Sequence, residues 1–273
     1  MPTLQVNGTS VAFTDTGAPR DRADAPTIVF GHGLLFSGWM FTDQIAALSQ
    51  QYRCVAIDWR GQGATPPAAD GKYDMDTLAL DAAAVIEALG AGAVHYVGLS
   101  MGGFVGMRLA ARRPDLIRSL TLLDTSADPE EPSAAIQDKA LAIVFRAFGL
   151  GPVRGPVQKI MFAPPFLADP RSGALIEEWM TQVASQDRGA VRQAVLAVAN
   201  RKGVADELGK IGAPTLVVVG EQDKPTPVEK ARRIHAGIAG SRLEIVPDCG
   251  HSSTIEQPKA LTELITDFVG TVA

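Results

Sequence analysis

Cysteine is scarce in this sequence, and basic residues are not in excess. The two cysteines, Cys54 and Cys249, lie far apart, which argues against a disulfide framework and suits a reducing compartment. Without clustered histidines beside them, they also provide no zinc site. The formal net charge of −5 lacks the basic excess that binding to nucleic acid or an anionic membrane would require. We therefore expect no metal and no nucleic-acid or membrane partner.

Long apolar runs are also missing. No uninterrupted stretch approaches the length of a membrane span, and residues 1–17 contain no basic region followed by an apolar core. We therefore expect a cytoplasmic protein. The apolar share of 46% and the charged share of 20% are those of an ordinary globular chain, and 273 residues suffice for one large α/β domain. The oligomeric state is not indicated.

Short, β-branched apolar stretches alternate with stretches of helical periodicity along most of the chain. Residues 27–30 and 54–58 are typical of buried strands, whereas 76–89 repeat apolar residues at helical spacing. Further strands are expected at 4–6, 11–14, 93–98, 119–124, 215–220 and 243–246. Because parallel strands need crossover connections, which are usually helices, this order predicts an α/β fold. Its sheet should be eight-stranded, mostly parallel and covered by helices on both faces.

The alternation stops between residues 128 and 206. This stretch contains no strand candidate, and its helical stretches are broken by glycine and proline pairs such as Gly155-Pro156 and Pro164-Pro165. We interpret it as a helical cap inserted after the sixth strand, over the carboxyl edge of the sheet. The predicted organisation is a core domain of residues 1–127 and 207–273 with a cap of residues 128–206.

The pentapeptide Gly98-Leu99-Ser100-Met101-Gly102 lies between an expected strand and an expected helix. In this context the G-x-S-x-G pattern forms a sharp turn, called a nucleophile elbow, in which the serine backbone is strained and the glycines avoid collisions with neighbouring elements. The hydroxyl then stands exposed at the helix N-terminus. Ser100 is therefore the candidate nucleophile.

A serine hydroxyl is a weak nucleophile at neutral pH, so it needs a base that accepts its proton. The sequence contains four histidines. His251 follows the expected strand 243–246 at the carboxyl edge, where α/β sheets place their active sites, and is the candidate base. His32 is interpreted as a structural turn residue, and His95 and His235 as ordinary surface or helix histidines.

The base must in turn be held by a carboxylate. Two aspartates, Asp124 and Asp223, follow expected strands between the serine and the histidine. Asp223 is preferred because its loop leads into the helix before the last strand and His251, whereas the chain after Asp124 enters the helical stretch. Thr226, followed by Pro227, is expected to cap that helix.

Attack on a carbonyl creates an oxyanion that needs hydrogen-bond donors. The elbow places the Met101 N–H at the positive end of its helix. The second donor is expected in the loop after strand 27–30, where Gly33 lets the chain approach the serine closely. The backbone N–H of Leu34 is the candidate.

Five motifs make this chain resemble the α/β-hydrolase superfamily over nearly its whole length. They are Phe30-Gly31-His32-Gly33, Asp58-Trp59-Arg60-Gly61-Gln62-Gly63, Gly98-Leu99-Ser100-Met101-Gly102-Gly103, Gly220-Glu221-Gln222-Asp223 and Gly250-His251. The elbow, Thr226-Pro227 and residues 251–258 resemble the branch of 3-oxoadipate enol-lactonases and small esterases. The resemblance implies the same roles: Ser100 as nucleophile, Asp223 as acid, His251 as base, and Leu34 and Met101 as oxyanion donors.

One motif partly imitates a dinucleotide-binding fingerprint. Gly31-His32-Gly33 follows one strand and Asp58 ends the next, but Phe36 stands where the third glycine belongs. No phosphate-binding Gly-Lys-Ser or Gly-Lys-Thr sequence is present either. We therefore expect no cofactor.

These residues predict a serine hydrolase that cleaves a small carboxylic ester or lactone through an acyl-enzyme. The aromatic residues expected to line its pocket are Phe36, Trp39, Phe145, Phe162 and Trp179. Candidates for binding a substrate carboxylate are Arg146, Arg154, Lys159, Arg188 and Arg192. Two alternatives remain. One is carbon–carbon bond hydrolysis or cofactor-free perhydrolysis by the same residues, and the other is a receptor-like protein that binds a ligand without turnover.

Overall fold

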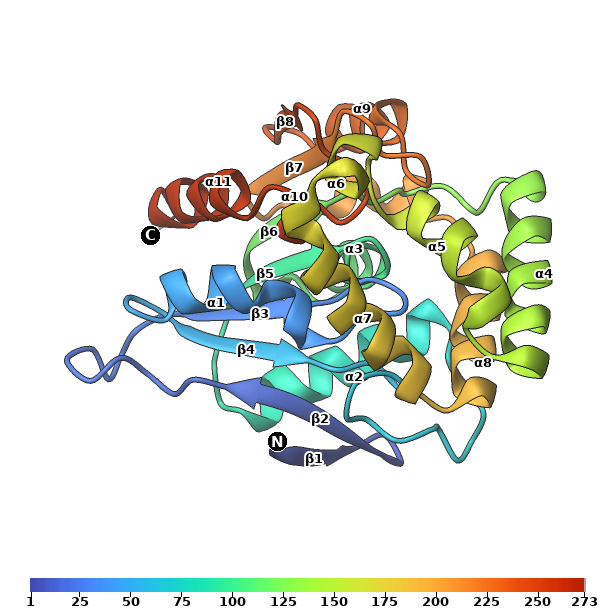
Figure 1. The fold of residues 1–273 in the computed structure, drawn as a ribbon. Coiled ribbons are helices and arrows are strands. Elements are labelled where there is room, and N and C mark those ends of the chain that lie inside the picture. Colours follow the sequence, from blue (N-terminus) through green and yellow to red (C-terminus); the bar gives the residue numbers. More distant parts are fainter. Residues whose placement is uncertain (273) are drawn as a thin grey trace.

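The computed structural model describes residues 1–272 and is built on one eight-stranded sheet (Figure 1). The strands are β1 (Thr3–Val6), β2 (Thr9–Asp15), β3 (Thr27–Gly31), β4 (Arg53–Ile57), β5 (Val94–Leu99), β6 (Ile117–Leu123), β7 (Thr215–Gly220) and β8 (Arg242–Val246). Their order across the sheet is β1-β2-β4-β3-β5-β6-β7-β8. β1 and β2 pair antiparallel at one edge, and the strands from β4 to β8 run parallel. The predicted sheet is confirmed.

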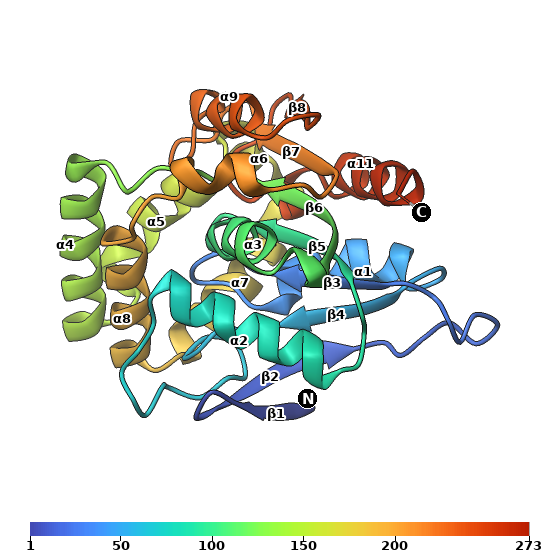
Figure 2. The ribbon, with the colours of Figure 1, turned by 180° about the vertical axis from the view of Figure 1, so that it is seen from behind.

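Helices cover both faces of this sheet, as predicted. They are α1 (Thr42–Leu48), α2 (Met75–Ala88), α3 (Met101–Arg112), α9 (Val228–Gly237), α10 (Ser253–Glu256) and α11 (Pro258–Gly270). α1 and α11 pack against each other on the face seen in Figure 1, and α2 and α3 on the face seen in Figure 2. Every residue of β5 and β7 is buried, because a parallel strand between two helical layers has no solvent-facing side.

Between β6 and β7 the chain leaves the sheet and forms a segment made of helices, residues 128–206, which we call the helical segment. Its helices are α4 (Pro132–Phe148), α5 (Arg154–Met161), α6 (Pro164–Ala168), α7 (Gly173–Ser185) and α8 (Arg188–Ala199). α4 and α8 pack side by side in both ribbon views. None of the helices in residues 1–272 combines the length and apolar character that crossing a membrane would require.

Two proline positions that were expected to interrupt helices begin them instead. Pro156 lies in the first turn of α5, and Pro164 is the first residue of α6. Amides of the first helical turn have no partner within the helix, so a proline there loses no hydrogen bond. The helical segment is therefore more continuously helical than its glycine and proline content indicates.

Candidate active site

Ser100 lies at the sharp turn between β5 and α3. Its backbone has φ 52° and ψ −111°, a conformation that is strained for any residue with a side chain. The hydroxyl of Thr125 donates to Ser100 O at 2.8 Å and helps to hold the turn. A Cβ at position 98 would collide with Gly102 O, and one at position 102 would collide with Gly31 O. Only glycine fits at Gly98 and Gly102, as the elbow motif requires.

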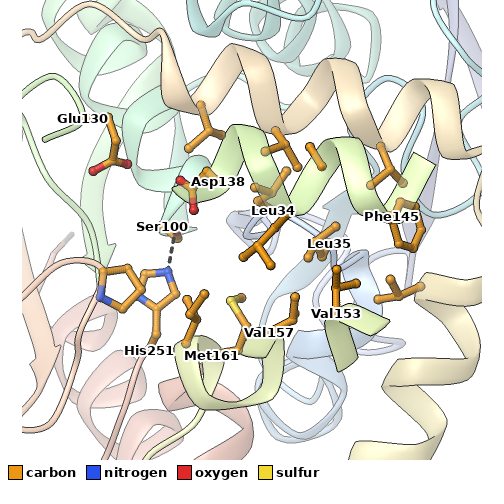
Figure 3. Close-up of a pocket in the computed structure, with 18 of the residues that line it drawn as sticks. Leu34, Leu35, Ser100, Glu130, Asp138, Phe145, Val153, Val157, Met161 and His251 are labelled. Carbon is orange, nitrogen blue, oxygen red and sulfur yellow. Dashed lines mark hydrogen bonds between the residues drawn. The ribbon is translucent and has the colours of Figure 1, made fainter. Parts of the chain in front are cut away.

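His251 faces this serine from the loop after β8. Its Nε2 lies 2.9 Å from Ser100 Oγ, although the two residues are 151 positions apart in the chain (Figure 3). The imidazole is buried, with 4% of the residue exposed. A neutral imidazole in this position is within hydrogen-bonding reach of the serine proton.

The carboxylate of Asp223 lies on the other side of the imidazole, with both oxygens 3.0 Å from His251 Nδ1. Thr226 fixes this carboxylate: its backbone N–H donates to Oδ1 at 3.0 Å and its hydroxyl to Oδ2 at 2.7 Å. The prediction that Thr226 caps α9 is wrong, because Pro227 occupies the N-cap position and the threonine hydroxyl binds Asp223 instead.

The environment of His251 favours its protonated form. Burial by itself lowers the pKa of the imidazole, since a charged ring is poorly solvated there. The charge and the hydrogen bond of Asp223 act in the opposite direction and prevail, so the pKa is raised above its ordinary 6.5. A base of this kind is neutral, and able to accept a proton, only on the alkaline side of that pKa.

Asp124, the other candidate acid, has a different environment. Its Oδ1 accepts a hydrogen bond from Gly220 N at 2.8 Å, and the residue is fully buried. Burial, and after it the negative charge of Asp223, raise the pKa of the Asp124 carboxyl well above its ordinary value. The structure brings Asp223, and not Asp124, into hydrogen-bonding contact with His251.

The loop after β3 also comes close to Ser100. Leu34 lines the same cavity as Ser100. Within residues 1–272, neither the Leu34 N–H nor the Met101 N–H donates to another group. The loop passes close to the serine at Gly33, where an added Cβ would lie 3.5 Å from Ser100 Cβ, an ordinary van der Waals distance. Two backbone donors are thus free beside the serine hydroxyl.

The remaining histidines have structural contacts. Trp59 N donates to His32 Nε2 at 3.0 Å, and Trp59 Nε1 donates to His32 O at 2.8 Å, so His32 holds the turn after β3. His95 is buried in β5, not at the surface as expected, and its Nδ1 lies 2.8 Å from Ser119 Oγ. Burial lowers the pKa of His95 to about 4. His235 is exposed on α9.

Glu256 supports the loop of His251, a role for which the sequence offered no signal. Its Oε2 accepts from Gly250 N at 3.0 Å and from Ala163 N at 2.9 Å, and its Oε1 accepts from Ser252 N at 3.0 Å. Burial raises the pKa of this carboxyl, and the three amide donors act against that rise. One side chain therefore fixes both neighbours of His251 and ties them to the helical segment.

A cavity of about 120 Å³ extends from Ser100 and His251 into the helical segment (Figure 3). Most of its wall belongs to the helical segment, chiefly through apolar side chains of α4, α5 and α8, and Leu34 and Leu35 line it on the side of the sheet. An apolar cavity of about 150 Å³ can hold a benzene molecule, so this one suits a compact organic group. Phe145 is the one predicted pocket residue that lines it.

The other four predicted pocket residues, Phe36, Trp39, Phe162 and Trp179, do not line this cavity. The rings of Phe36 and Trp179 stack with centroids 4.9 Å apart, and Phe162 meets Trp179 edge-on at 5.2 Å. The indole N–H of Trp39 donates to Glu178 of α7 at 2.7 Å. These side chains join the loop after β3 to α7, so they attach the helical segment to the core.

The five basic residues considered for binding a carboxylate also lie outside the cavity, and three of them, Arg146, Arg188 and Arg192, line a separate surface groove. Within the described chain no arginine or lysine lines the cavity, whereas two acidic side chains, Glu130 and Asp138, do. Residues 1–272 contain no group of three histidine, cysteine, aspartate or glutamate side chains placed to hold a metal ion.

An eight-stranded sheet with a serine at the turn after its fifth strand is the arrangement of one large enzyme family, and the sequence matches it. The pattern of the alpha/beta hydrolase family matches residues 28–264. The chain therefore belongs to the alpha/beta hydrolase family, and it is a hydrolase.

Two named proteins and one crystal structure are similar to the chain over most of its length. It is similar to 3-oxoadipate enol-lactonase 2 of Acinetobacter baylyi, with 29% identity over 244 residues that cover 89% of this chain and 88% of that protein. It is also similar to a Pseudomonas syringae protein named for carbamate hydrolysis, RutD, with 26% identity covering 91% and 95%. The crystal structure of the enol-lactonase from Burkholderia xenovorans superposes with a TM-score of 0.90 at 27% identity, covering 98% and 100%. The predicted resemblance to this branch is confirmed.

Proposed function

We propose that the protein is a serine hydrolase that cleaves a small carboxylic ester or lactone, with Ser100, His251 and Asp223 as its catalytic triad. The observation that carries the proposal is the continuous contact from Ser100 Oγ to His251 Nε2 at 2.9 Å and from His251 Nδ1 to Asp223 at 3.0 Å. Nucleophile, base and orienting acid are the three roles that acyl transfer through a serine needs.

The proposed reaction has two halves. Ser100 Oγ attacks the carbonyl carbon while His251 Nε2 takes its proton, and the oxyanion accepts hydrogen bonds from Leu34 N–H and Met101 N–H. The tetrahedral intermediate collapses to an acyl-enzyme as His251 gives the proton to the departing alkoxide. Water then attacks the acyl carbonyl with His251 as base, and release of the carboxylic acid restores the serine hydroxyl.

The helical segment, residues 128–206, acts in this proposal as a cap that forms the substrate pocket. Ser100, His251, Asp223 and both proposed donors lie outside it, whereas most of the cavity wall belongs to it. The cap therefore selects the substrate, and the core performs the chemistry. No cofactor is needed for these steps, and we expect the enzyme to act in the cytoplasm on a free small molecule.

The lactonases among the relatives support the ester or lactone class. The Acinetobacter baylyi relative is named a 3-oxoadipate enol-lactonase, and the Burkholderia xenovorans structure is that of an enol-lactonase. A carbamate is the competing substrate class, because the Pseudomonas syringae relative is named for it. Both classes present a carbonyl to the same nucleophile, so substrate assays have to separate them.

The test is a panel of short chromogenic esters, small lactones and matched carbamates, with ligand-induced thermal shifts measured on the same samples. We expect turnover of esters or lactones. Faster turnover of carbamates would change the assigned class, and binding without any turnover would favour the receptor-like alternative. Analysis of the products separates ester hydrolysis from carbon–carbon bond cleavage and from perhydrolysis.

Replacement of the nucleophile tests the assignment of Ser100. We expect Ser100→Ala to fold normally and to lose activity by roughly 10³-fold or more, as happens when one member of a cooperative triad is removed. A fluorophosphonate probe should label the wild type at Ser100, located by mass mapping. Labelling of a different serine, or near-wild-type kcat in the variant, would contradict the proposal.

A further inference from the structure

Two acidic side chains enter an otherwise apolar cavity close to the nucleophile. Glu130 precedes α4, and Asp138 lies on α4; Figure 3 shows both carboxylates on the side of the cavity that holds Ser100. Most of the remaining wall is leucine, valine, isoleucine and phenylalanine. A charged group in such a wall is energetically costly unless it has a partner, because apolar surroundings solvate it poorly.

Glu130 has a partner inside the protein. Its Oε2 accepts a hydrogen bond from Arg201 Nη1 at 2.5 Å, and both side chains are largely buried. The Arg201 guanidinium also lies 4.2 Å from the centre of the Phe104 ring, where a cation is attracted to the aromatic face. The charge of Glu130 is therefore compensated by a fixed cation behind the cavity wall.

Asp138 has no such partner. Among residues 1–272 no side chain or amide donates a hydrogen bond to its carboxylate, and no basic residue forms an ion pair with it. Burial and then the nearby charge of Glu130 raise the pKa of Asp138 to about 6, with Arg201 acting in the opposite direction. At neutral pH the carboxylate is still mostly ionised. The cavity thus presents an acceptor that only a bound molecule or water can satisfy.

This acceptor has opposite effects on two kinds of ligand. A ligand that brings a hydroxyl, an amide N–H or an ammonium group to Asp138 gains a charge-assisted hydrogen bond. A ligand that brings a carboxylate to the same place meets a like charge on a half-buried aspartate, without an arginine or lysine in the described cavity wall to offset it.

We propose that Asp138 determines substrate specificity: it selects compact esters or lactones whose apolar body carries a hydrogen-bond donor, and it excludes substrates that carry a carboxylate at that position. The inference rests on the proposed function, because it places the substrate in the cavity beside Ser100. It separates this enzyme from any lactonase of the same fold whose lactone carries a carboxylate at that position.

The test uses three esters that differ only at the end of the acyl chain, which carries a methyl, a hydroxymethyl or a carboxylate group, prepared in several short chain lengths. The assay is run at about pH 8, where the carboxylate of Asp138 is ionised and the carboxylate of the third ester is ionised as well. For the wild type we expect kcat/KM to be highest for the hydroxymethyl ester and lowest, by at least about tenfold, for the carboxylate ester.

Two variants and a control test whether Asp138 causes this ranking of the three esters. Asp138→Asn removes the charge and should raise kcat/KM of the carboxylate ester relative to the methyl ester by about tenfold. Asp138→Leu also removes the acceptor and should abolish the preference for the hydroxymethyl ester. Asp267→Asn, at an exposed position of α11, changes the net charge equally and should keep the wild-type ranking. An unchanged ranking in both Asp138 variants would overturn the inference.

A binding measurement separates this inference from the proposed function. Ketones in which a methylene group replaces the ester oxygen cannot be hydrolysed, and their affinities can be measured by calorimetry for the wild type and Asp138→Asn. If none of the esters is cleaved but the ketones keep the expected order, the proposed function fails and the role of Asp138 stands. If the esters are cleaved and the ketones bind without regard to Asp138, only the role of Asp138 fails.

Discussion

At the scale of single residues, the state of His251 should set the pH dependence of the reaction. The imidazole accepts the serine proton only when it is neutral, and the charge of Asp223 raises its pKa above 6.5. Activity should therefore be low in acid and rise with pH, with a midpoint above that value. The measurement is kcat/KM from about pH 5 to 9 on an uncharged ester.

His251→Ala should remove this pH dependence together with most of the rate. An uncharged ester keeps the titration of the substrate out of the profile. A profile that stays flat from acid to alkali in the wild type would argue against a histidine base.

Two aspartates near His251 should respond very differently to the same substitution. Asp223 contacts Nδ1 and fixes the tautomer, so Asp223→Asn should lower kcat by about 10⁴-fold with little effect on binding. Asp124 accepts a hydrogen bond from Gly220 N and makes none to His251, and asparagine keeps an oxygen acceptor of the same shape, so Asp124→Asn should change kcat little. Each purified variant is assayed on one good ester, with circular dichroism as the control for folding. The reverse outcome would move the acid to the end of β6.

At the scale of elements, the loop of His251 and the helical segment are joined by one side chain. Glu256 accepts hydrogen bonds from Gly250, Ser252 and Ala163, and glutamine in its place would turn an NH₂ group toward at least one of these donors. We expect Glu256→Gln to lower the free energy of unfolding by about 1–3 kcal/mol, measured by urea denaturation. It should also lower kcat because His251 is less well fixed.

The matched control for this variant is Glu263→Gln on α11, where the side chain is exposed. It makes the same chemical change without removing a buried acceptor, so its stability should stay within about 0.5 kcal/mol of the wild type. Equal losses in the two variants would mean that the three amide contacts of Glu256 contribute little.

Two phenylalanines of the helical segment should have separable effects. Phe145 lines the cavity, so Phe145→Ala should enlarge it and shift kcat/KM toward longer acyl chains. Phe162 packs against Trp179 outside the cavity, so Phe162→Ala should lower the free energy of unfolding by about 3–5 kcal/mol. Ester profiles and denaturation curves on both variants check this. A shift in chain-length preference for Phe162→Ala alone would reverse the assignment.

At the scale of the whole molecule, the features that could be predicted from sequence are those with a local cause. The order of strands and helices follows from periodicity, and the elbow follows from glycines that lie within two residues of Ser100. The place of Asp223 follows from chain order, although Asp124 also ends a neighbouring strand. For the elements and the elbow, the pattern and the reason for it lie in one short stretch of sequence, whereas Asp223 is indicated by the order of Ser100, Asp223 and His251 along the chain.

The features that could not be predicted depend on how the helical segment lies on the core. Phe145 and Phe162 look alike in the sequence, and only tertiary packing puts one at the cavity and the other against Trp179. Glu256 meets Ala163 across 93 positions of chain. Asp138 looks like an ordinary surface aspartate of an amphipathic helix until the cavity is seen beside it. Contacts of this range leave no periodic trace in a sequence.

The helical segment is one unbroken stretch of chain, and this has a consequence for how such an enzyme can diverge. The residues proposed for bond cleavage and those proposed for selecting the substrate are encoded in different parts of the gene, so exchange of a single internal stretch could alter preference without touching the nucleophile. The exchanged stretch would still have to offer an amide where Ala163 meets Glu256 and an aromatic surface where Trp179 meets Phe36. A change of substrate preference by such an exchange is thus limited by a few contacts between the helical segment and the core, and not by the catalytic residues.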